Sequence, residues 1–236
     1  MRKFWPLGAF LVIVVIHHVL LGVQAYSLVT KGLLMGTLLL GVLTVGLVTD
    51  RELLATRRVR YAFVLLCGGI ALSLAGDLGI VVSLEFGMIW FVLALAVYIG
   101  MLVGPARARS LSWWAIPYGL CYSPIIALLW VHLGERGPLI AFYGLLLMLL
   151  AVVATMVGRV AALGGLVFLV AEGLLGFRLF WPEVLAGFPD PWQDVAISLL
   201  YCAGQGLLAF GVLLRLSDEP RLATERASRV VVPVPS

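Results

Sequence analysis

The sequence predicts an all-α membrane protein, a bundle of about eight transmembrane helices. Of its 236 residues, 63% are hydrophobic and 12% are charged, whereas a soluble domain carries charge on roughly a quarter of its residues. Stretches of about 20 apolar residues recur, which is the length of an α-helix that crosses a bilayer. They are apolar on all sides, without the alternation typical of a membrane β-barrel. Helices are therefore expected.

The predicted spans share the basic residues very unequally between the two faces of the membrane. Of the 16 lysines and arginines, only Lys31, Arg136 and Arg178 fall on the far face, and the other 13 lie on the face of both termini. The positive-inside rule then predicts a multi-pass protein of the cell (inner) membrane with both termini cytoplasmic. The predicted spans cover residues 5–24, 32–48, 60–78, 86–104, 112–133, 137–157, 160–181 and 194–214.

The two ends of the chain allow separate predictions. Residues 1–216 are expected to form a single transmembrane domain, and the polar residues 217–236 a short disordered cytoplasmic tail. At the other end, Arg2-Lys3, an apolar stretch and Val23-Gln24-Ala25 resemble a signal peptide. Cleavage there would leave seven spans, but the apolar stretch is longer than a usual signal-peptide core, which favours an uncleaved first span.

Composition also narrows the partners. The net charge of +4 does not indicate nucleic acid, because the basic residues lie in short segments between apolar stretches. Cys67, Cys121 and Cys202 lie inside apolar stretches without metal-ligand spacing, so neither a disulfide framework nor a metal site is expected. The predicted partner is the lipid bilayer, and nothing in the sequence identifies a protein partner.

Two carboxylic acids lie in or beside predicted spans. An ionisable residue within a membrane span is costly and often functional. Asp77 ends the third span near its outer interface, and Glu172 lies deeper in the seventh. Asp77 has an alternative interpretation as an interfacial loop acid, and Glu172 as a protonated packing residue. Helical spacing puts Ser73 on the same face as Asp77.

Other polar residues add to this picture without settling the function. Tyr201 and Gln205 share a face of the last span, and Gly87, Phe91, Leu95 and Tyr98 form a stripe on the fourth. His17 and His18 show no spacing for a metal, which favours a structural role. From the residues alone, two carboxylates with such companions fit either proton chemistry on a lipid-like molecule or transport.

Several short elements, in order from Lys31 to Gln205, give a resemblance to the YhhN-like family of membrane proteins, whose characterised members are lysoplasmalogenases. Two positions differ from the family pattern. Leu95 stands where the family usually has histidine, and Ala171-Glu172 where it usually has Ser-Asp. The matching elements are Lys31-Gly32-Leu33-Leu34, Ser73–Asp77, Phe86-Gly87 with Phe91 and Tyr98, Tyr143 with Met148, Gly165 with Phe168 and Glu172, and Tyr201–Gln205.

The resemblance implies hydrolysis of the vinyl-ether bond of a lysoplasmalogen, a lysophospholipid-like substrate, without a metal or organic cofactor. Glu172 is the expected acid, since burial favours a protonated carboxyl, and Asp77 the expected base, with the reverse assignment open. Lys31 is expected to meet the lipid phosphate. The remaining substrate-binding residues expected to line the cavity are Ser73, Tyr98, Tyr143, Tyr201 and Gln205. The alternative is a catalytically impaired or non-enzymatic lipid-binding or transport protein of the same fold.

Overall fold

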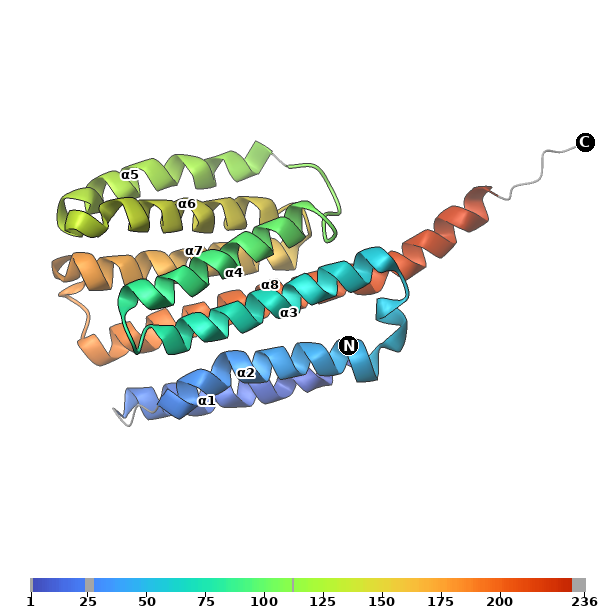
Figure 1. Ribbon diagram of the computed structural model, residues 1–236, viewed down its shortest axis with the longest axis horizontal. Helices are drawn as coiled ribbons and strands as arrows, with labels where there is room; N and C mark the ends of the chain where they lie inside the picture. The colour runs from blue at the N-terminus through green and yellow to red at the C-terminus, as the bar shows by residue number, and fades with distance from the viewer. Residues whose placement is uncertain (1, 24–27, 112, 231–236) are drawn as a thin grey trace, which may run out of the picture.

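The computed structural model describes residues 2–23, 28–111 and 113–230, and within these ranges it contains helices but no strands (Figure 1). The predicted all-α class is therefore confirmed. Short 3-10 helices η1, η3, η4, η5 and η6 cover Arg2–Leu7, Arg51–Leu54, Trp113–Ala115, Gly134–Arg136 and Pro182–Leu185, and η2, Val45–Thr49, is a π-helical turn. The α-helices are α1 (Gly8–Gly22), α2 (Leu28–Thr44), α3 (Arg57–Gly79), α4 (Leu84–Val103), α5 (Ile116–Leu133), α6 (Gly137–Ala154), α7 (Arg159–Phe180) and α8 (Asp190–Val230).

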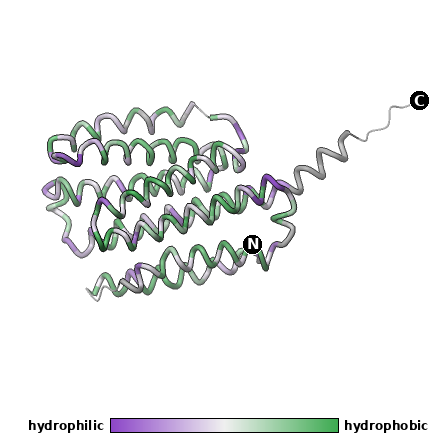
Figure 2. The backbone as a smooth tube through the Cα atoms, in the orientation of Figure 1, coloured by the Kyte–Doolittle hydropathy of each residue, from purple (hydrophilic) through white to green (hydrophobic). Residues whose placement is uncertain are grey.

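Seven stretches among the described residues are long and apolar enough to cross a membrane. One of them, Ile116–Ala154, contains both α5 and α6. This stretch folds back on itself: Gly134 has φ of 54°, and the hydroxyl of Tyr122 in α5 donates a hydrogen bond to the Ala141 carbonyl in α6. The helices are apolar over most of their length and polar near their ends (Figure 2). The chain is thus a multi-pass membrane protein, whereas eight crossings and their orientation stay predictions.

Glycines bring the central helices into close contact. A Cβ atom added to Gly164 of α7 would lie 2.3 Å from the backbone nitrogen of Leu208 in α8, and one added to Gly211 of α8 would lie 2.4 Å from the nitrogen of Ala161. Small residues allow this approach of two backbones, which is a principal source of helix association in lipid. These contacts therefore fix the register of α7 against α8. Gly69 of α3 packs against Tyr98 of α4 and fixes the register of that pair.

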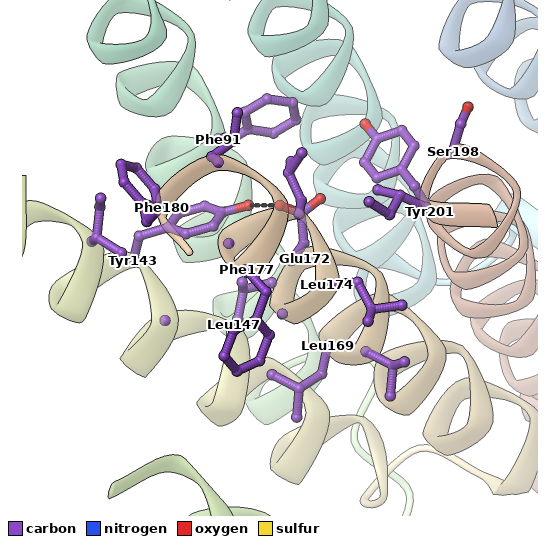
Figure 3. A pocket seen from close by; sticks show the side chains of 18 of the residues that line it. Phe91, Tyr143, Leu147, Leu169, Glu172, Leu174, Phe177, Phe180, Ser198 and Tyr201 are labelled. Carbon is purple, nitrogen blue, oxygen red and sulfur yellow. Dashed lines mark hydrogen bonds between the residues drawn. The ribbon is translucent and has the colours of Figure 1, made fainter. Parts of the chain in front are cut away.

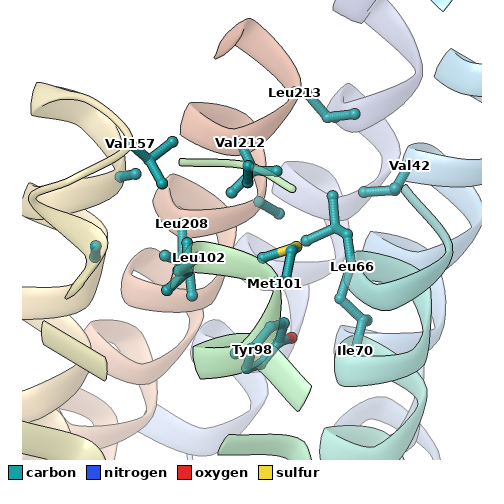
Figure 4. Packing of buried hydrophobic residues seen from close by; sticks show 14 of the residues in the cluster. Val42, Leu66, Ile70, Tyr98, Met101, Leu102, Val157, Leu208, Val212 and Leu213 are labelled. Carbon is teal, nitrogen blue, oxygen red and sulfur yellow. The ribbon is translucent and has the colours of Figure 1, made fainter. Parts of the chain in front are cut away.

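The half of the bundle nearer the termini is filled with apolar side chains. Leu66 and Ile70 of α3 pack with Met101 and Leu102 of α4, and all four are almost fully buried (Figure 4). Leu208, Val212 and Leu213 of α8 complete this cluster. The cavity described below is lined mainly by residues toward the opposite end of the bundle.

The last helix is longer than expected. The sequence predicts a disordered tail from residue 217, but α8 continues to Val230; residues 231–236 lie outside the described residues. Glu219 forms ion pairs with Arg215 one turn earlier, at 3.1 Å, and with Arg58 of α3, at 3.3 Å. Such pairs stabilise a helix beyond its apolar part. At the other end, Gln24 and Ala25 of the candidate cleavage site lie outside the described residues, so cleavage stays untested.

The end of the bundle that carries both termini also gathers basic side chains. Lys3 pairs with Asp50 at 2.8 Å, Arg58 donates to the carbonyl oxygens of Pro105 and Arg107, and Arg109 donates to that of Thr155. These bonds tie together loops that follow α2, α4 and α6. They agree with the charge asymmetry from which the sequence predicts cytoplasmic termini.

The orientation can be tested with reporter fusions. A reporter that is active only in the cytoplasm should be active when fused after Leu216 and inactive when fused after Glu135, in the η5 turn at the opposite end of the bundle. A reporter that requires export should show the reverse pattern. Cytoplasmic activity after Glu135 would contradict the predicted orientation.

Candidate functional site

A cavity of about 1240 Å³ lies toward the end of the bundle opposite to the termini and extends along α5 as far as Pro117, in the first turn of that helix. Its walls are mostly leucine, isoleucine, valine and aromatic side chains, so it is suited to an apolar ligand. Five of the eight site residues predicted from the sequence line it: Lys31, Asp77, Tyr143, Glu172 and Tyr201. The two carboxyl groups thus face one apolar space, and Figure 3 shows Glu172 with Tyr143 and Tyr201 in its wall.

Asp77 is held in the last turn of α3 by a hydrogen bond from α8. The hydroxyl of Tyr201 donates to its Oδ2 atom at 3.0 Å, and Asp77 is only 5% exposed. The Tyr201 ring lies edge-on to Phe91 of α4 and Phe168 of α7, with ring centroids 6.4 and 5.7 Å away. These contacts leave the tyrosine little freedom, so the carboxyl oxygen is positioned by three neighbouring helices.

Glu172 has an equivalent partner on a different helix. The hydroxyl of Tyr143 in α6 donates to its Oε2 atom at 2.9 Å (Figure 3). The two helices are close because Gly165 of α7 packs on Ala151 of α6, where an added Cβ would lie 3.0 Å from the Ala151 Cα. Each acid of the cavity therefore receives a tyrosine hydroxyl on one oxygen. The second oxygen of each carboxyl can carry or accept a proton.

Ser73, Tyr98 and Gln205 do not line the cavity, contrary to the expectation from the sequence. The Tyr98 hydroxyl donates to Oε1 of Gln205 at 3.0 Å, and Nε2 of Gln205 donates to Oγ of Ser73 at 3.2 Å. All three are almost fully buried, one turn beyond the Asp77–Tyr201 pair toward the filled half of the bundle. Helical spacing puts Ser73 on the face of Asp77 and Gln205 on the face of Tyr201, but at a depth the cavity does not reach. They form a hydrogen-bonded support beneath it.

Lys31 brings positive charge to the cavity from α2. It lines the space beside His17 of α1, whose Nδ1 is 3.0 Å from the Thr30 hydroxyl and hydrogen-bonded with it. The Lys31 charge interacts electrostatically with both Asp77 and Glu172. An ammonium group at this place favours a ligand with an anionic part at the end of the cavity away from the termini.

Sequence reasoning missed two acids at the opening of the cavity. Asp190 and Asp194, one turn apart at the start of α8, line it and bind Arg178 of α7 at 3.2 and 3.5 Å. Their spacing was visible in the sequence, but it is equally typical of a solvated helix start. Sequence reasoning also missed α5, which contributes Tyr118 and Tyr122 to the wall, because no polar or charged pattern distinguishes that helix.

The matching family model covers residues 26–212 and is described as the YhhN family. The chain belongs to the YhhN family. The match includes the segments that carry Lys31, both acids and both tyrosines of this YhhN protein. In comparisons with curated proteins and with solved structures, nothing matches.

The two departures from the family pattern lie in different surroundings. Leu95 of this YhhN chain is 1% exposed, belongs to the apolar core and does not line the cavity. Glu172 does line it, and Ala171 beside it is fully buried. Position 95 therefore belongs to the packing behind the cavity, whereas position 172 contributes a carboxyl group to it.

The buried support can be tested by replacing Tyr98 with phenylalanine. Tyr98→Phe removes the donor to Gln205 and leaves a buried amide oxygen unpaired, which should lower the free energy of unfolding by about 1–3 kcal/mol. Tyr61→Phe is the matched control, because Tyr61 is 60% exposed. Unfolding in detergent by denaturant measures both variants. Equal stability of the two would show that the Tyr98 bond does not support the bundle.

Proposed function

We propose that this protein is a membrane-embedded hydrolase that cleaves the vinyl-ether bond of lysoplasmalogens. The observation that carries the proposal is the pair of carboxyl groups, Asp77 and Glu172, that face one apolar cavity with a tyrosine hydroxyl on each. The products are a fatty aldehyde and a glycerophospho-alcohol. Membership of the YhhN family supports the proposal, because the characterised members of the YhhN-like family are lysoplasmalogenases.

Protonation of carbon is the first and most demanding step. The carboxylic acid of Glu172 donates its proton to the β-carbon of the vinyl ether, where the electrons of the double bond form the new C–H bond. The α-carbon and the ether oxygen then share the positive charge of an oxocarbenium ion. The Glu172 carboxylate left behind, together with the Asp77 carboxylate, stabilises this cation in surroundings of low polarity.

Water completes the reaction in two proton transfers. Asp77 takes a proton from a water molecule, whose oxygen attacks the α-carbon and gives a hemiacetal. Glu172 then takes the proton of the hemiacetal hydroxyl, the bond to the glycerol oxygen breaks, and Asp77 returns its proton to that oxygen. Both carboxyl groups end in their starting forms, as paired carboxyls do in glycoside hydrolysis.

The other cavity residues hold the groups in place. Tyr143 and Tyr201 each donate to one carboxyl oxygen, which fixes the direction in which the second oxygen faces. Lys31 binds the phosphate of the substrate at the outer opening. Exclusion of bulk water by the apolar wall strengthens these electrostatic interactions and limits side reactions of the cation.

The decisive experiment is aldehyde release from a lysoplasmalogen by the purified protein, with an ester lysophospholipid as the control substrate. Asp77→Asn and Glu172→Gln should each lower the rate by about two to four orders of magnitude, because each removes a proton-transferring group. Glu135→Gln, a change of an exposed acid at the same end of the bundle, should leave the rate unchanged. Absence of release by the wild-type protein at any pH would refute the hydrolase.

A second experiment concerns Leu95. Because this side chain lies in the apolar core and not in the cavity, Leu95→His should not increase the rate of aldehyde release. It should lower the free energy of unfolding by about 1–3 kcal/mol, the cost of a polar group in apolar surroundings. Leu93→His, at a site 44% exposed on the same helix, controls for the introduction of histidine alone. A rise in rate for Leu95→His would show that the native site lacks a group that it needs.

A further inference from the structure

Part of the cavity is lined by α5 and α7. On α7 the lining residues Leu166, Leu169, Val170, Gly173 and Phe177 recur every three or four positions, so they share one face. Figure 3 shows Leu169 and Phe177 in the wall beside Glu172. The facing residues of α5 are Tyr118, Tyr122, Ile125, Ile126 and Leu129. Apart from the tyrosine hydroxyls, this part of the cavity is apolar throughout.

This part of the cavity is open at its side. Val170 and Ile125 line the cavity and yet are 45% and 41% exposed at the surface of the bundle. Gly173 also lines the cavity, and a Cβ atom added to it would have no other atom within 4 Å. A Cβ atom on Gly176 would lie 3.9 Å from Leu129. Gly173, next to Glu172, thus faces open space, whereas three residues later Gly176 lies near α5.

Both walls belong to stretches that are apolar enough to span a membrane. An opening on the outer face of such helices meets lipid rather than water. From the level of Ile125 to Pro117, which also lines the cavity, eight residues of α5 give a length of roughly 12 Å, enough for an extended alkyl segment of roughly ten carbons. This part of the cavity therefore leads from the acids to the hydrocarbon region of the bilayer.

We propose that this opening, lined by Tyr118, Tyr122, Ile125, Val170 and Gly173 and here named the side portal, holds the single hydrocarbon chain of the substrate and admits it from the bilayer. The absence of a side chain at Gly173 keeps the portal open next to Glu172. The identity of the chain rests on the proposed function, but the binding of a chain does not depend on catalysis.

The chemistry of the cavity selects this occupant. The cavity joins an apolar wall to Lys31, so it suits an amphiphile with one hydrocarbon chain and a phosphate in its head group. The hydrocarbon chain moves from lipid to apolar side chains, so its transfer has little hydrophobic driving force. The shape complementarity between the chain and the portal therefore decides which chain binds. An aldehyde formed at Glu172 remains in the portal and leaves into the bilayer by the same opening.

Photo-cross-linking tests the portal without catalysis. The full-length protein in phosphatidylcholine nanodiscs is mixed with an ester lysophosphatidylcholine that carries a diazirine in the middle of its chain. Mass spectrometry then locates the labelled peptides. We expect labels in the segments of α5 around Ile125 and of α7 around Val170, removed by excess unlabelled lysophosphatidylcholine. A two-chain phosphatidylcholine with the same diazirine should not give labels that this competitor removes.

Variants of both walls add a second readout. Gly173→Leu and Ile125→Trp fill the portal from opposite sides and should each reduce the competed labelling by roughly tenfold, with a smaller loss for Gly173→Ala. Gly100→Leu is the matched control, since Gly100 is exposed on α4 and a Cβ there also meets no atom within 4 Å. Size-exclusion chromatography in detergent shows which variants fold. If Gly173→Leu does not fold, Gly173→Ala and Ile125→Trp still test the portal.

The outcomes for the portal and for the hydrolase are distinct. Competed labels at both walls in a protein that releases no aldehyde would support the portal and refute the hydrolase. Aldehyde release together with labels elsewhere, or labels that the competitor does not remove, would refute the portal alone. Equal removable labelling by the two-chain probe would show that a bilayer phospholipid occupies the portal, which also overturns the proposal.

Discussion

The hydrogen bond from a tyrosine to each membrane-embedded carboxyl group is the interaction on which the rest of the structure depends. A carboxyl group in hydrocarbon costs several kcal/mol unless it has a partner. Asp77 finds its partner only if α8 lies against α3, and Glu172 only if α6 lies against α7. The two bonds therefore constrain four helices. They also leave one oxygen of each acid for chemistry.

Close helix contacts make these bonds possible. Gly164 and Gly211 seat α7 on α8, and Gly165 seats α7 on α6. With the α6–α7 distance set by Gly165, Tyr143 is long enough to reach Glu172 on the next helix. Around α3, α4 and α8 the half of the bundle nearer the termini is filled by apolar side chains, whereas Gly173 of α7 lines the cavity, where an added Cβ would meet no atom within 4 Å.

The departures from the family pattern are consistent with this arrangement. Glutamate at position 172 is one methylene longer than aspartate, and its carboxyl reaches the Tyr143 hydroxyl at 2.9 Å. The neighbouring Ala171 is fully buried in the core, where it needs no hydrogen-bond partner. Leu95 fills apolar space behind the cavity. The Glu172 carboxyl thus has a hydrogen-bond donor, and Ala171 and Leu95 have apolar neighbours.

The sequence by itself determined that this protein is a helical membrane bundle and that Asp77 and Glu172 are its unusual residues, because hydropathy and charge are local properties of the chain. Helical periodicity also placed Ser73 with Asp77 and Gln205 with Tyr201. Only the tertiary structure decided which helix each face meets. In the structure Asp77 is hydrogen-bonded to a tyrosine 124 residues away. Tyr98, Ser73 and Gln205 form a hydrogen-bonded support below the cavity instead of lining it. The cavity is also lined by α5, which no polar pattern in the sequence distinguishes. Periodicity defines a face, but the depth of a cavity and the partner of a face depend on how the helices pack.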